Sequence, residues 1–466
     1  MKERLTILTL LRSEPEDWKE KTVGVCGWIR TMRNQKACVF IELNDGSSLS
    51  NLQLIVEHTL PDYKEVKPLL STGAAIQAKG RMAHSPGAEQ HLEMQVSHLS
   101  VYGPCPDHYP LQKKGHSLSF LRSLPHLRSR TNMQGALARI RSRLAYYIHH
   151  FFQQKGFVYL QSPMITHSDC EGAGALFQVT TLPLDHLPTT SEGKVDYGKD
   201  FFSHPAYLTV SGQLNAEAYA CSHSQVYTFG PTFRAEHSHT PRHLAEFWMV
   251  EPEVAFVTLP QIIELAEELI TYLVKEVLTH CREDLSLFHK WVDPQLFSRL
   301  EKRLNLPPIR LTYSEAVNLL QKANRVFSYP ARWGQDLQSE HEHYLIDAFD
   351  QATLILTDYP KESKAFYMRE NADGNTVAAF DMLLPKIGEV IGGSQREERE
   401  SLLRQKIASL GLSPQKYDWY LELRNYGSVP HGGFGMGFER FVQFVTGVDN
   451  IREVVAFPRA PAHCLC

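Results

Sequence analysis

The chain has 466 residues, enough for roughly two to four domains, and its 43% hydrophobic and 21% charged content excludes a largely disordered protein. A net charge of −4 excludes a uniformly basic nucleic-acid binder, although a local basic surface remains compatible with it. The eight cysteines form no Cys-x-x-Cys pair, the start at Met1 lacks a basic-then-apolar leader, and no apolar run reaches the about 20 residues of a membrane helix. We therefore expect a cytoplasmic protein with reduced thiols and no membrane segment.

The first hundred residues predict a small β-barrel. Short alternating segments are separated by turn residues such as Asn44-Asp45-Gly46, which is the pattern of strands joined by tight connections. We expect strands at residues 23–29, 39–43, 51–56, 75–80 and 91–99. An OB-fold is one candidate for a barrel of this size.

A proline-rich stretch from Pro104 to Pro125 predicts a linker or hinge. Around it the charge is one-sided, because residues 108–168 contain nine Lys or Arg and no Asp or Glu. This pattern is typical of a surface that contacts phosphates, but a solvated basic helix face would look the same. Charge alone does not decide between the two.

Apolar residues at helical spacing predict three long helices in the rest of the chain, at residues 133–153, 261–280 and about 397–410. Between the first two, up to Glu253, the sequence is typical of strands and loops, and between the last two we again expect strands and turns. Strands dominate and helices are interspersed irregularly, which predicts an α+β fold with an antiparallel sheet.

The segment from Thr228 to Phe247 predicts a strand, a polar loop and a return strand. Arg234 and Glu236 lie on one face because strands have a period of two, and Arg242 and His243 fall in the loop. A fixed guanidinium with further cations nearby suits a polyphosphate, and Phe247 could stack on a base. A salt-bridged hairpin without a ligand is the alternative.

A second segment places two carboxylates, Asp381 and Glu389, on either side of a short apolar run. They suit Mg²⁺, which takes few carboxylates and completes its shell with phosphates and water. Gly392 and Gly393 follow, where the backbone can approach a ligand closely. Without other evidence, a structural role is the more frequent one for such a pair.

Two further segments are less specific. The glycines between His431 and Arg440 precede a predicted helix, but their spacing is neither that of a P-loop nor that of a dinucleotide-binding turn, so tight packing would also explain them. Glu171 and Glu217 could contact an ammonium or an amide, although each alone is more often structural.

In chain order and spacing, these segments together resemble the three sequence motifs of class II aminoacyl-tRNA synthetases. Residues 157–163, with Pro163, are similar to motif 1, residues 233–247 to motif 2, and residues 435–440 to motif 3. The segments at 211–214, 234–243, 388–397 and 456–459 are closer still to the aspartate, asparagine and lysine subgroup, and within it to the synthetases for asparagine.

The resemblance implies an α+β protein in which an N-terminal OB-fold β-barrel is joined to a catalytic domain with a central antiparallel sheet flanked by helices. It implies an anticodon-binding domain at residues 1–105, a hinge at 106–132 and the catalytic domain at 133–466. The motifs would extend over about 135–163, 228–256 and 431–447.

The activity that the resemblance implies is ATP-dependent ligation of L-asparagine to tRNA(Asn) through an aminoacyl-adenylate, with release of AMP and pyrophosphate. It also implies Mg²⁺ as a cofactor and a homodimer. Arg234 would bind the α-phosphate and act in catalysis, and Phe247 and Arg440 would sandwich the adenine. The other implied contacts are Glu236, Arg242 and His243 with ATP, Asp381 and Glu389 with Mg²⁺, and Glu171, Gln213, Glu217 and Arg396 with the amino acid.

Asparagine is predicted over aspartate from two neighbouring residues. Aspartate synthetases carry a lysine where this chain has Ala216, and a carboxylate follows here at Glu217. Loss of a cation and gain of an acceptor would favour an amide and repel a carboxylate. The alternatives are an aspartyl-tRNA synthetase with relaxed tRNA choice, a tRNA-independent asparagine synthetase and a non-catalytic RNA-binding relative. Ala216 argues against the first, and an intact OB-like domain with Phe40 and Gln53 argues against the second. The third would have a broken ATP site, whereas Arg234, Glu389 and Arg440 are all present.

In the N-terminal domain the resemblance makes Phe40 the platform on which an anticodon base stacks. Arg30 and Arg33 would contact phosphates and Gln53 would read the central uridine, whereas pattern alone would make Phe40 a core residue. The chain departs from the family at His237 and His239, where asparagines are usual, and at Ala456, where a proline is usual.

Overall fold

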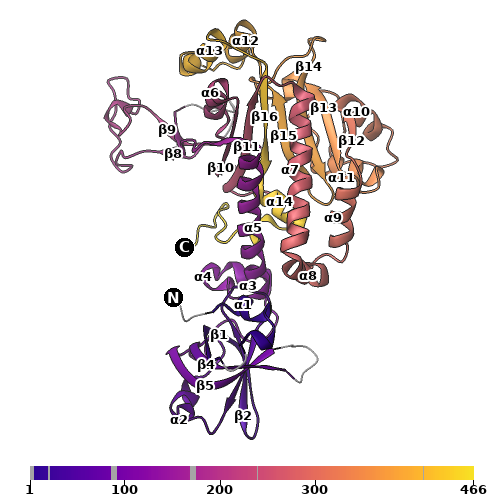
Figure 1. Cartoon of the computed structure of the whole chain (residues 1–466). Coiled ribbons are helices and arrows are strands. Elements are labelled where there is room, and N and C mark those ends of the chain that lie inside the picture. The colour runs from indigo at the N-terminus through magenta and orange to yellow at the C-terminus, as the bar shows by residue number, and fades with distance from the viewer. Residues whose placement is uncertain (1–4, 19–20, 86–91, 168–174, 239, 413) are drawn as a thin grey trace. The chain divides into compact units, whose positions relative to one another are not determined.

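The computed structural model describes residues 5–18, 21–85, 92–167, 175–238, 240–412 and 414–466. The chain separates into two compact units, of which the first comprises residues 1–139 with Cys466 and the second residues 140–465. Each unit has its own layered architecture and is described by itself (Figure 1).

The first unit contains the expected barrel, and it closes in the strand order β1-β2-β3-β5-β4. Alternate residues of the strands point inward, and the inward-facing aliphatic side chains of β2 and β3, such as Ile41 and Leu54, are completely buried. Short helices flank the barrel, and two of them lie in the segment predicted as a hinge, residues 106–132. The strands are β1 (Val23–Asn34), β2 (Cys38–Asn44), β3 (Leu52–Glu57), β4 (Ala75–His84) and β5 (Leu92–Gly103), and the helices are α1 (Ile7–Leu11), α2 (Tyr63–Val66), α3 (Leu118–Arg122) and α4 (Pro125–Arg128).

The second unit is built on an eight-stranded sheet in the order β12-β13-β14-β15-β16-β11-β10-β6. Its six central strands are antiparallel and only the pairs at its two edges are parallel, which confirms the expected α+β class. A small second sheet has the order β7-β9-β8. The strands are β6 (Val158–Tyr159), β7 (Ile165–Thr166), β8 (Gln178–Val179), β9 (Ala206–Leu208), β10 (Gln225–Phe233), β11 (Glu246–Ala255), β12 (Ile309–Thr312), β13 (Leu354–Pro360), β14 (Thr376–Leu384), β15 (Gly388–Gln395) and β16 (His431–Gly437).

The three predicted helices form where the periodicity places them, as α5 (Asn132–Gln154), α7 (Leu259–His280) and α12 (Glu400–Ser409). α7 begins at a capping box formed by Thr258 and Gln261, and its apolar stripe covers β14, β15 and β16. Tyr272 of α7 packs against Tyr147 and Phe151 of α5. α14 (Phe438–Thr446) follows the glycine-rich strand β16 and packs on β11.

Two stretches expected to hold only strands and turns contain helices. α6 (Gln213–His223) interrupts the first, and α8 (Arg282–Trp291), α9 (Leu296–Asn305), α10 (Tyr313–Gln321) and α11 (Ser339–Ala348) interrupt the second. A further helix that was not predicted, α13 (Asp418–Asn425), follows α12. These helices are short, and several bury polar side chains on their inner faces, such as Glu217 on α6 and His341 on α11. That mixture hides the apolar period that reveals a longer helix. The capping box Thr312/Glu315 at the start of α10 was a usable sequence signal.

Candidate active site

The loop between β10 and β11 and the start of α14 enclose a cavity of about 150 Å³. The hairpin keeps its register to the end, with Phe233 opposite Glu246, and the Arg234 amide donates to the Ala245 carbonyl at 2.9 Å. All six residues expected to contact ATP line this one cavity, although they come from two segments about 200 residues apart. These residues are Arg234, Glu236, Arg242, His243, Phe247 and Arg440.

The cations of this cavity are held by side chains and backbone of other strands and helices. The Arg234 guanidinium lies 5.5 Å from the centre of the Phe247 ring. Arg440 donates to the Glu389 carbonyl at 2.9 Å, and its guanidinium lies 3.4 Å from the Glu389 carboxylate. Arg242 forms an ion pair with Glu342 of α11 at 3.4 Å and also donates to Ser339.

His243 acts in this cavity as a hydrogen-bonding group more than as a cation. Its Nδ1 lies 3.1 Å from the Ser238 hydroxyl and also contacts that of Thr240. Burial, reinforced by the neighbouring Arg440 guanidinium, lowers the pKa of His243 below its usual value. The lowered pKa favours the neutral ring, so Arg242 is the more strongly charged of these two loop residues.

Asp381 and Glu389 converge beside Gly392, on the neighbouring strands β14 and β15. A Cβ atom at Gly392 would lie 3.3 Å from Asp381 Oδ1 and 3.2 Å from Glu389 Oε1, so glycine keeps open the space between the two carboxylates. Lys364 pairs with the other oxygen of Asp381 at 2.8 Å. Burial would raise the pKa of Glu389, but Arg440, Lys364 and Arg234 outweigh it and hold the pKa below its usual value. For Asp381 burial prevails over Lys364, and its pKa is raised.

The residues expected to hold the amino acid lie in a network of buried charges. Glu217 on α6 is completely buried and accepts from Gln213 Nε2 at 3.0 Å. Arg396 lies just after β15, where it donates to both oxygens of Glu253 and to the Ser394 hydroxyl. Arg396 is thus oriented towards Glu253, and its Nε lies 3.9 Å from Glu217 Oε1. Glu171 lies outside the described residues.

Comparison with known proteins identifies the family. The profile described as "tRNA synthetases class II (D, K and N)" matches residues 119–461, and "OB-fold nucleic acid binding domain" matches residues 23–102. The chain is 56% identical to the asparagine–tRNA ligase of Protochlamydia amoebophila, with 93% of each chain covered. It is 52% identical to the chloroplastic/mitochondrial asparagine–tRNA ligase of Arabidopsis thaliana, with 95% of this chain and 80% of that one covered.

Among solved structures, the asparaginyl-tRNA synthetase of Pyrococcus horikoshii complexed with asparaginyl-adenylate matches with a TM-score of 0.86 and 30% identity over 100% of both chains. A putative aspartyl-tRNA synthetase from Leishmania major, at 21% identity and a TM-score of 0.80, shares the fold. The chain belongs to the asparagine–tRNA ligase family of class II tRNA synthetases.

Several residues of this synthetase's site were not found by sequence reasoning. Glu253 and Lys364 pair with Arg396 and Asp381, and Glu342 pairs with Arg242. Tyr420 and Arg424 of α13 both contact Glu217. The signal for each was only a charged or polar residue within a segment that otherwise buries apolar side chains, which does not reveal its partner.

The position that would carry a lysine in aspartate synthetases is packed in apolar surroundings. Ala216 of α6 is fully buried with Ala220 and Val226, and Leu160 packs against the three. The next residue, Glu217, meets the charged network described above. Adjacent positions of one helix thus reach very different environments.

In the OB-fold unit, three of the four predicted anticodon contacts share the outer face of the barrel. Phe40 is half-buried on β2, directly opposite Arg33 on β1, whose guanidinium lies 5.5 Å from the ring centre. Gln53 on β3 points the same way and donates to Glu93 at 3.1 Å. Arg30 is not grouped with them, because its guanidinium donates to the Arg130 carbonyl and to Asn132. Phe40 is therefore not part of the barrel core.

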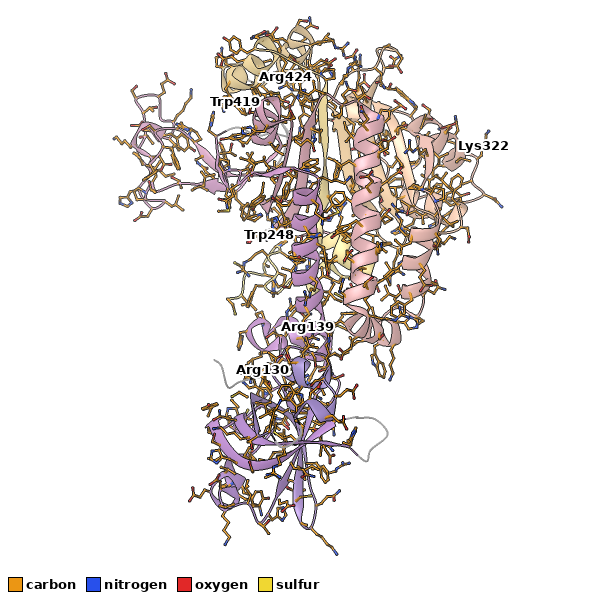
Figure 2. The ribbon with its side chains drawn as sticks, in the orientation of Figure 1. Arg130, Arg139, Trp248, Lys322, Trp419 and Arg424 are labelled. Atoms are coloured by element: carbon orange, nitrogen blue, oxygen red, sulfur yellow. The ribbon has the colours of Figure 1, made fainter. Side chains whose placement is uncertain are left out.

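The basic stretch contributes to a cavity of about 570 Å³ within the first unit, lined among others by Lys113, Lys114 and His116. Arg130 lies 5.7 Å from the ring centres of both Trp28 and Tyr109, and Arg139 donates to the Gly46 carbonyl at 2.9 Å (both arginines are labelled in Figure 2). These basic groups line a concave surface, which favours phosphate contact over a merely solvated helix face.

Other expectations concern His237, His239, the thiols and the membrane. His237 is exposed in the β10–β11 loop, and His239 lies outside the described residues. The seven cysteines of the described residues are free thiols. In the part of the chain that the structure describes, no helix is both long and apolar enough to cross a membrane.

Proposed function

We propose that this protein ligates L-asparagine to tRNA(Asn) with ATP, through an asparaginyl-adenylate and with release of AMP and pyrophosphate. One observation supports this most: motif 2 and motif 3 bring all six expected ATP contacts into one cavity, in a chain about half identical to asparagine–tRNA ligases. We expect the protein to work in the cytoplasm, where tRNA is charged. The free cysteines of the described residues are compatible with that reducing compartment.

The chemistry requires positioning and charge stabilisation more than covalent catalysis. The asparagine carboxylate attacks the α-phosphorus and pyrophosphate leaves, after which a terminal hydroxyl of the tRNA attacks the adenylate carbonyl. Arg234 would neutralise the charge that develops on the α-phosphate, and Phe247 and Arg440 would hold the adenine between them; all three side chains line the same cavity, which supports these roles. Glu236, Arg242 and His243 would contact the rest of the nucleotide.

Magnesium fits the pair Asp381 and Glu389. Their oxygens converge on the space that Gly392 leaves open, and two carboxylates with water and phosphate oxygens satisfy this hard cation. The ion would neutralise phosphate charge when bound. Lys364 holds Asp381 in place from its other side, at 2.8 Å.

For the amino acid, Gln213 and Glu171 would bind the α-ammonium end, Arg396 the side-chain carbonyl and Glu217 the amide NH₂ group. An ionised Glu217 accepts from an amide but repels the carboxylate of aspartate. Ala216 supplies no compensating cation and lies in an apolar cluster. These facts favour asparagine over the aspartate alternative.

The tRNA would contact the barrel face with Phe40, Arg33 and Gln53, while Arg30 would support the hinge side of the same unit. Stacking on Phe40 would provide affinity, and the Gln53 amide would distinguish the base edge. The homodimer would form through motif 1, where large apolar side chains are exposed.

The decisive experiment is ATP–pyrophosphate exchange with asparagine and with aspartate, followed by charging of tRNA(Asn). We expect exchange with asparagine, little with aspartate, and a loss of about 10²–10³-fold in kcat for Arg234→Ala. Exchange with aspartate at an equal rate would instead indicate a relaxed aspartyl enzyme. Formation of free asparagine from aspartate without tRNA would indicate the tRNA-independent synthetase.

A further inference from the structure

Glu217, which the proposed function assigns to the asparagine amide, is held mainly by the short helix α13. The Tyr420 hydroxyl lies 2.7 and 2.9 Å from the two carboxylate oxygens, and Arg424 Nη2 lies 2.7 Å from Oε2. Arg424 also donates to the Tyr420 hydroxyl at 2.9 Å and to the Glu397 carbonyl at 3.0 Å. All three side chains are buried.

The helix lies at the end of the large sheet where α12 and α6 are found, and Figure 2 labels Arg424 there. α13 contacts α6, the helix that carries Glu217, and α12. Tyr420 and Arg424 are one helical turn apart, so both side chains emerge from the same face of α13. One rigid face of a short helix thus presents a hydroxyl and a guanidinium to the same carboxylate.

Of the other charged groups around Glu217, one guanidinium is paired elsewhere and one imidazole also contacts the carboxylate. Arg396 donates to both oxygens of Glu253, so it remains 3.9 Å from Glu217. His431 of β16 faces Glu217 through Nε2 at 3.0 Å and the Val429 carbonyl through Nδ1 at 2.8 Å. Arg424 is therefore the guanidinium dedicated to Glu217.

We propose that Arg424, supported by Tyr420, is a positioning residue for amino-acid specificity, which keeps Glu217 an ionised hydrogen-bond acceptor and keeps Arg396 for the substrate. This inference rests on the proposed function. A buried carboxylate without a counterion either takes up a proton or recruits another cation. A protonated Glu217 would donate to the carboxylate of aspartate, and a recruited Arg396 would turn away from the side-chain carbonyl.

The charge balance supports this assignment. Burial by itself would raise the pKa of Glu217, but Arg424, His431 and Arg396 outweigh burial and hold the pKa far below its usual range. The second carboxylate, Glu253, competes for Arg396, and burial raises its pKa despite that guanidinium. The Cys221 thiol is a further titratable neighbour, and its pKa is raised by burial and then by Glu217.

The test compares Arg424→Met with wild type in pyrophosphate exchange, using asparagine and aspartate at pH 6 and pH 8. Methionine keeps an apolar stem of similar length but removes the charge. We expect the asparagine-to-aspartate ratio of kcat/KM to fall at least ten-fold in this variant, and to fall further at pH 6, where Glu217 would take up a proton. The wild-type ratio should not differ between the two pH values.

Two variants control the result. Arg424→Lys keeps the charge and should recover most of the ratio. Arg404→Met removes an exposed ion pair with Glu400 on α12 and should leave the ratio unchanged. A folded Arg424→Met protein with the wild-type ratio at both pH values would overturn the proposal, as would an equal loss of both activities without pH dependence.

If Arg424→Met does not fold, Tyr420→Phe decides, because it removes only the hydroxyl that contacts Glu217. We then expect a decrease of several-fold in the ratio, larger at pH 6, and an unchanged ratio would overturn the proposal. A wild-type protein that fails to activate asparagine would instead overturn the proposed function. The two failures are therefore distinguishable.

Discussion

At the scale of single residues, the functional side chains fall into two groups with different environments. Glu217, Glu253 and Arg396 are buried charges whose partners come from separate strands and helices. Phe40 and Arg33 instead lie on an open face of the barrel. Packing within the protein gives little reason for a large aromatic ring beside a cation there. Buried charges are costly unless paired, whereas a half-buried aromatic on an open face costs little and remains available to a base.

Phe40→Ala should raise the KM for tRNA by about ten-fold, because stacking contributes about 1–3 kcal/mol per base. Pyrophosphate exchange should be unchanged, since the substitution lies in the other unit from the ATP cavity. Aminoacylation and exchange rates measured on one preparation provide the comparison.

The matched control is Phe256→Ala, which removes a phenylalanine that is 68% exposed in the second unit and should leave the KM for tRNA unchanged. Equal loss of charging and exchange in Phe40→Ala would show that Phe40 supports folding of the barrel instead.

At the scale of elements, the adjacent strands β14, β15 and β16 explain why glycines gather in two segments. A Cβ atom on Gly393 would overlap the Phe380 ring and lie 2.6 Å from the Phe434 Cβ, and one on Gly433 would overlap the Pro252 carbonyl. Glycine at these positions allows neighbouring strands to approach closely. Tight strand packing therefore explains Gly433 in the glycine-rich segment between His431 and Arg440, and Gly393 on the neighbouring strand. Gly392 differs, because its neighbours are the carboxylates Asp381 and Glu389.

This contrast predicts different effects of alanine at two adjacent positions of β15. Gly393→Ala should destabilise the protein by about 1–3 kcal/mol, because the ring and backbone around it would have to move. Gly392→Ala should change stability less but raise the Mg²⁺ concentration needed for half-maximal exchange, because the methyl group would fill the space between the carboxylates.

Thermal unfolding and a magnesium titration of the exchange reaction measure the two effects, and each variant serves as the control of the other. An unchanged magnesium requirement in a folded Gly392→Ala protein would contradict the proposed metal site.

Elements also show where sequence reasoning was limited. The helices α5 and α7 were predictable, because each keeps one apolar period over its 23 and 22 residues. The hairpin β10–β11 was predictable because a polar loop separates its two strands. α6 and α13 were not predicted, although they carry Glu217 and Arg424. The polar residues that make these helices functional occupy their buried faces, which removes the apolar stripe on which the prediction depends.

At the scale of the whole molecule, the region of motif 1 exposes several large apolar side chains. Tyr146, Val158, Met164 and Ile165 are 56%, 44%, 52% and 41% exposed. Exposed apolar side chains along this stretch suit a contact with a second copy of the chain, as the proposed homodimer requires.

The double variant Met164→Glu/Ile165→Glu should therefore be monomeric, because two buried carboxylates without partners would disfavour association. Light scattering measures the molecular mass, and we expect about twice the chain mass of 53.1 kDa for wild type. Leu184→Glu, at a position that is 76% exposed on the connection between β8 and β9, is the control and should remain dimeric. A monomeric wild type would contradict the homodimer.

Local patterns in the sequence by themselves determined the barrel, the α+β class and the long helices, because these features depend on residues close together in the chain, whose spacing directly reflects strand and helix periods. The kind of chemistry and the residues around ATP followed instead from the resemblance of the ordered motifs to a known family. Only the tertiary structure decided which charges meet. Glu217 contacts Arg424 across 207 positions and Arg396 contacts Glu253 across 143, and the free energy of such buried pairs depends on distances that no local pattern encodes.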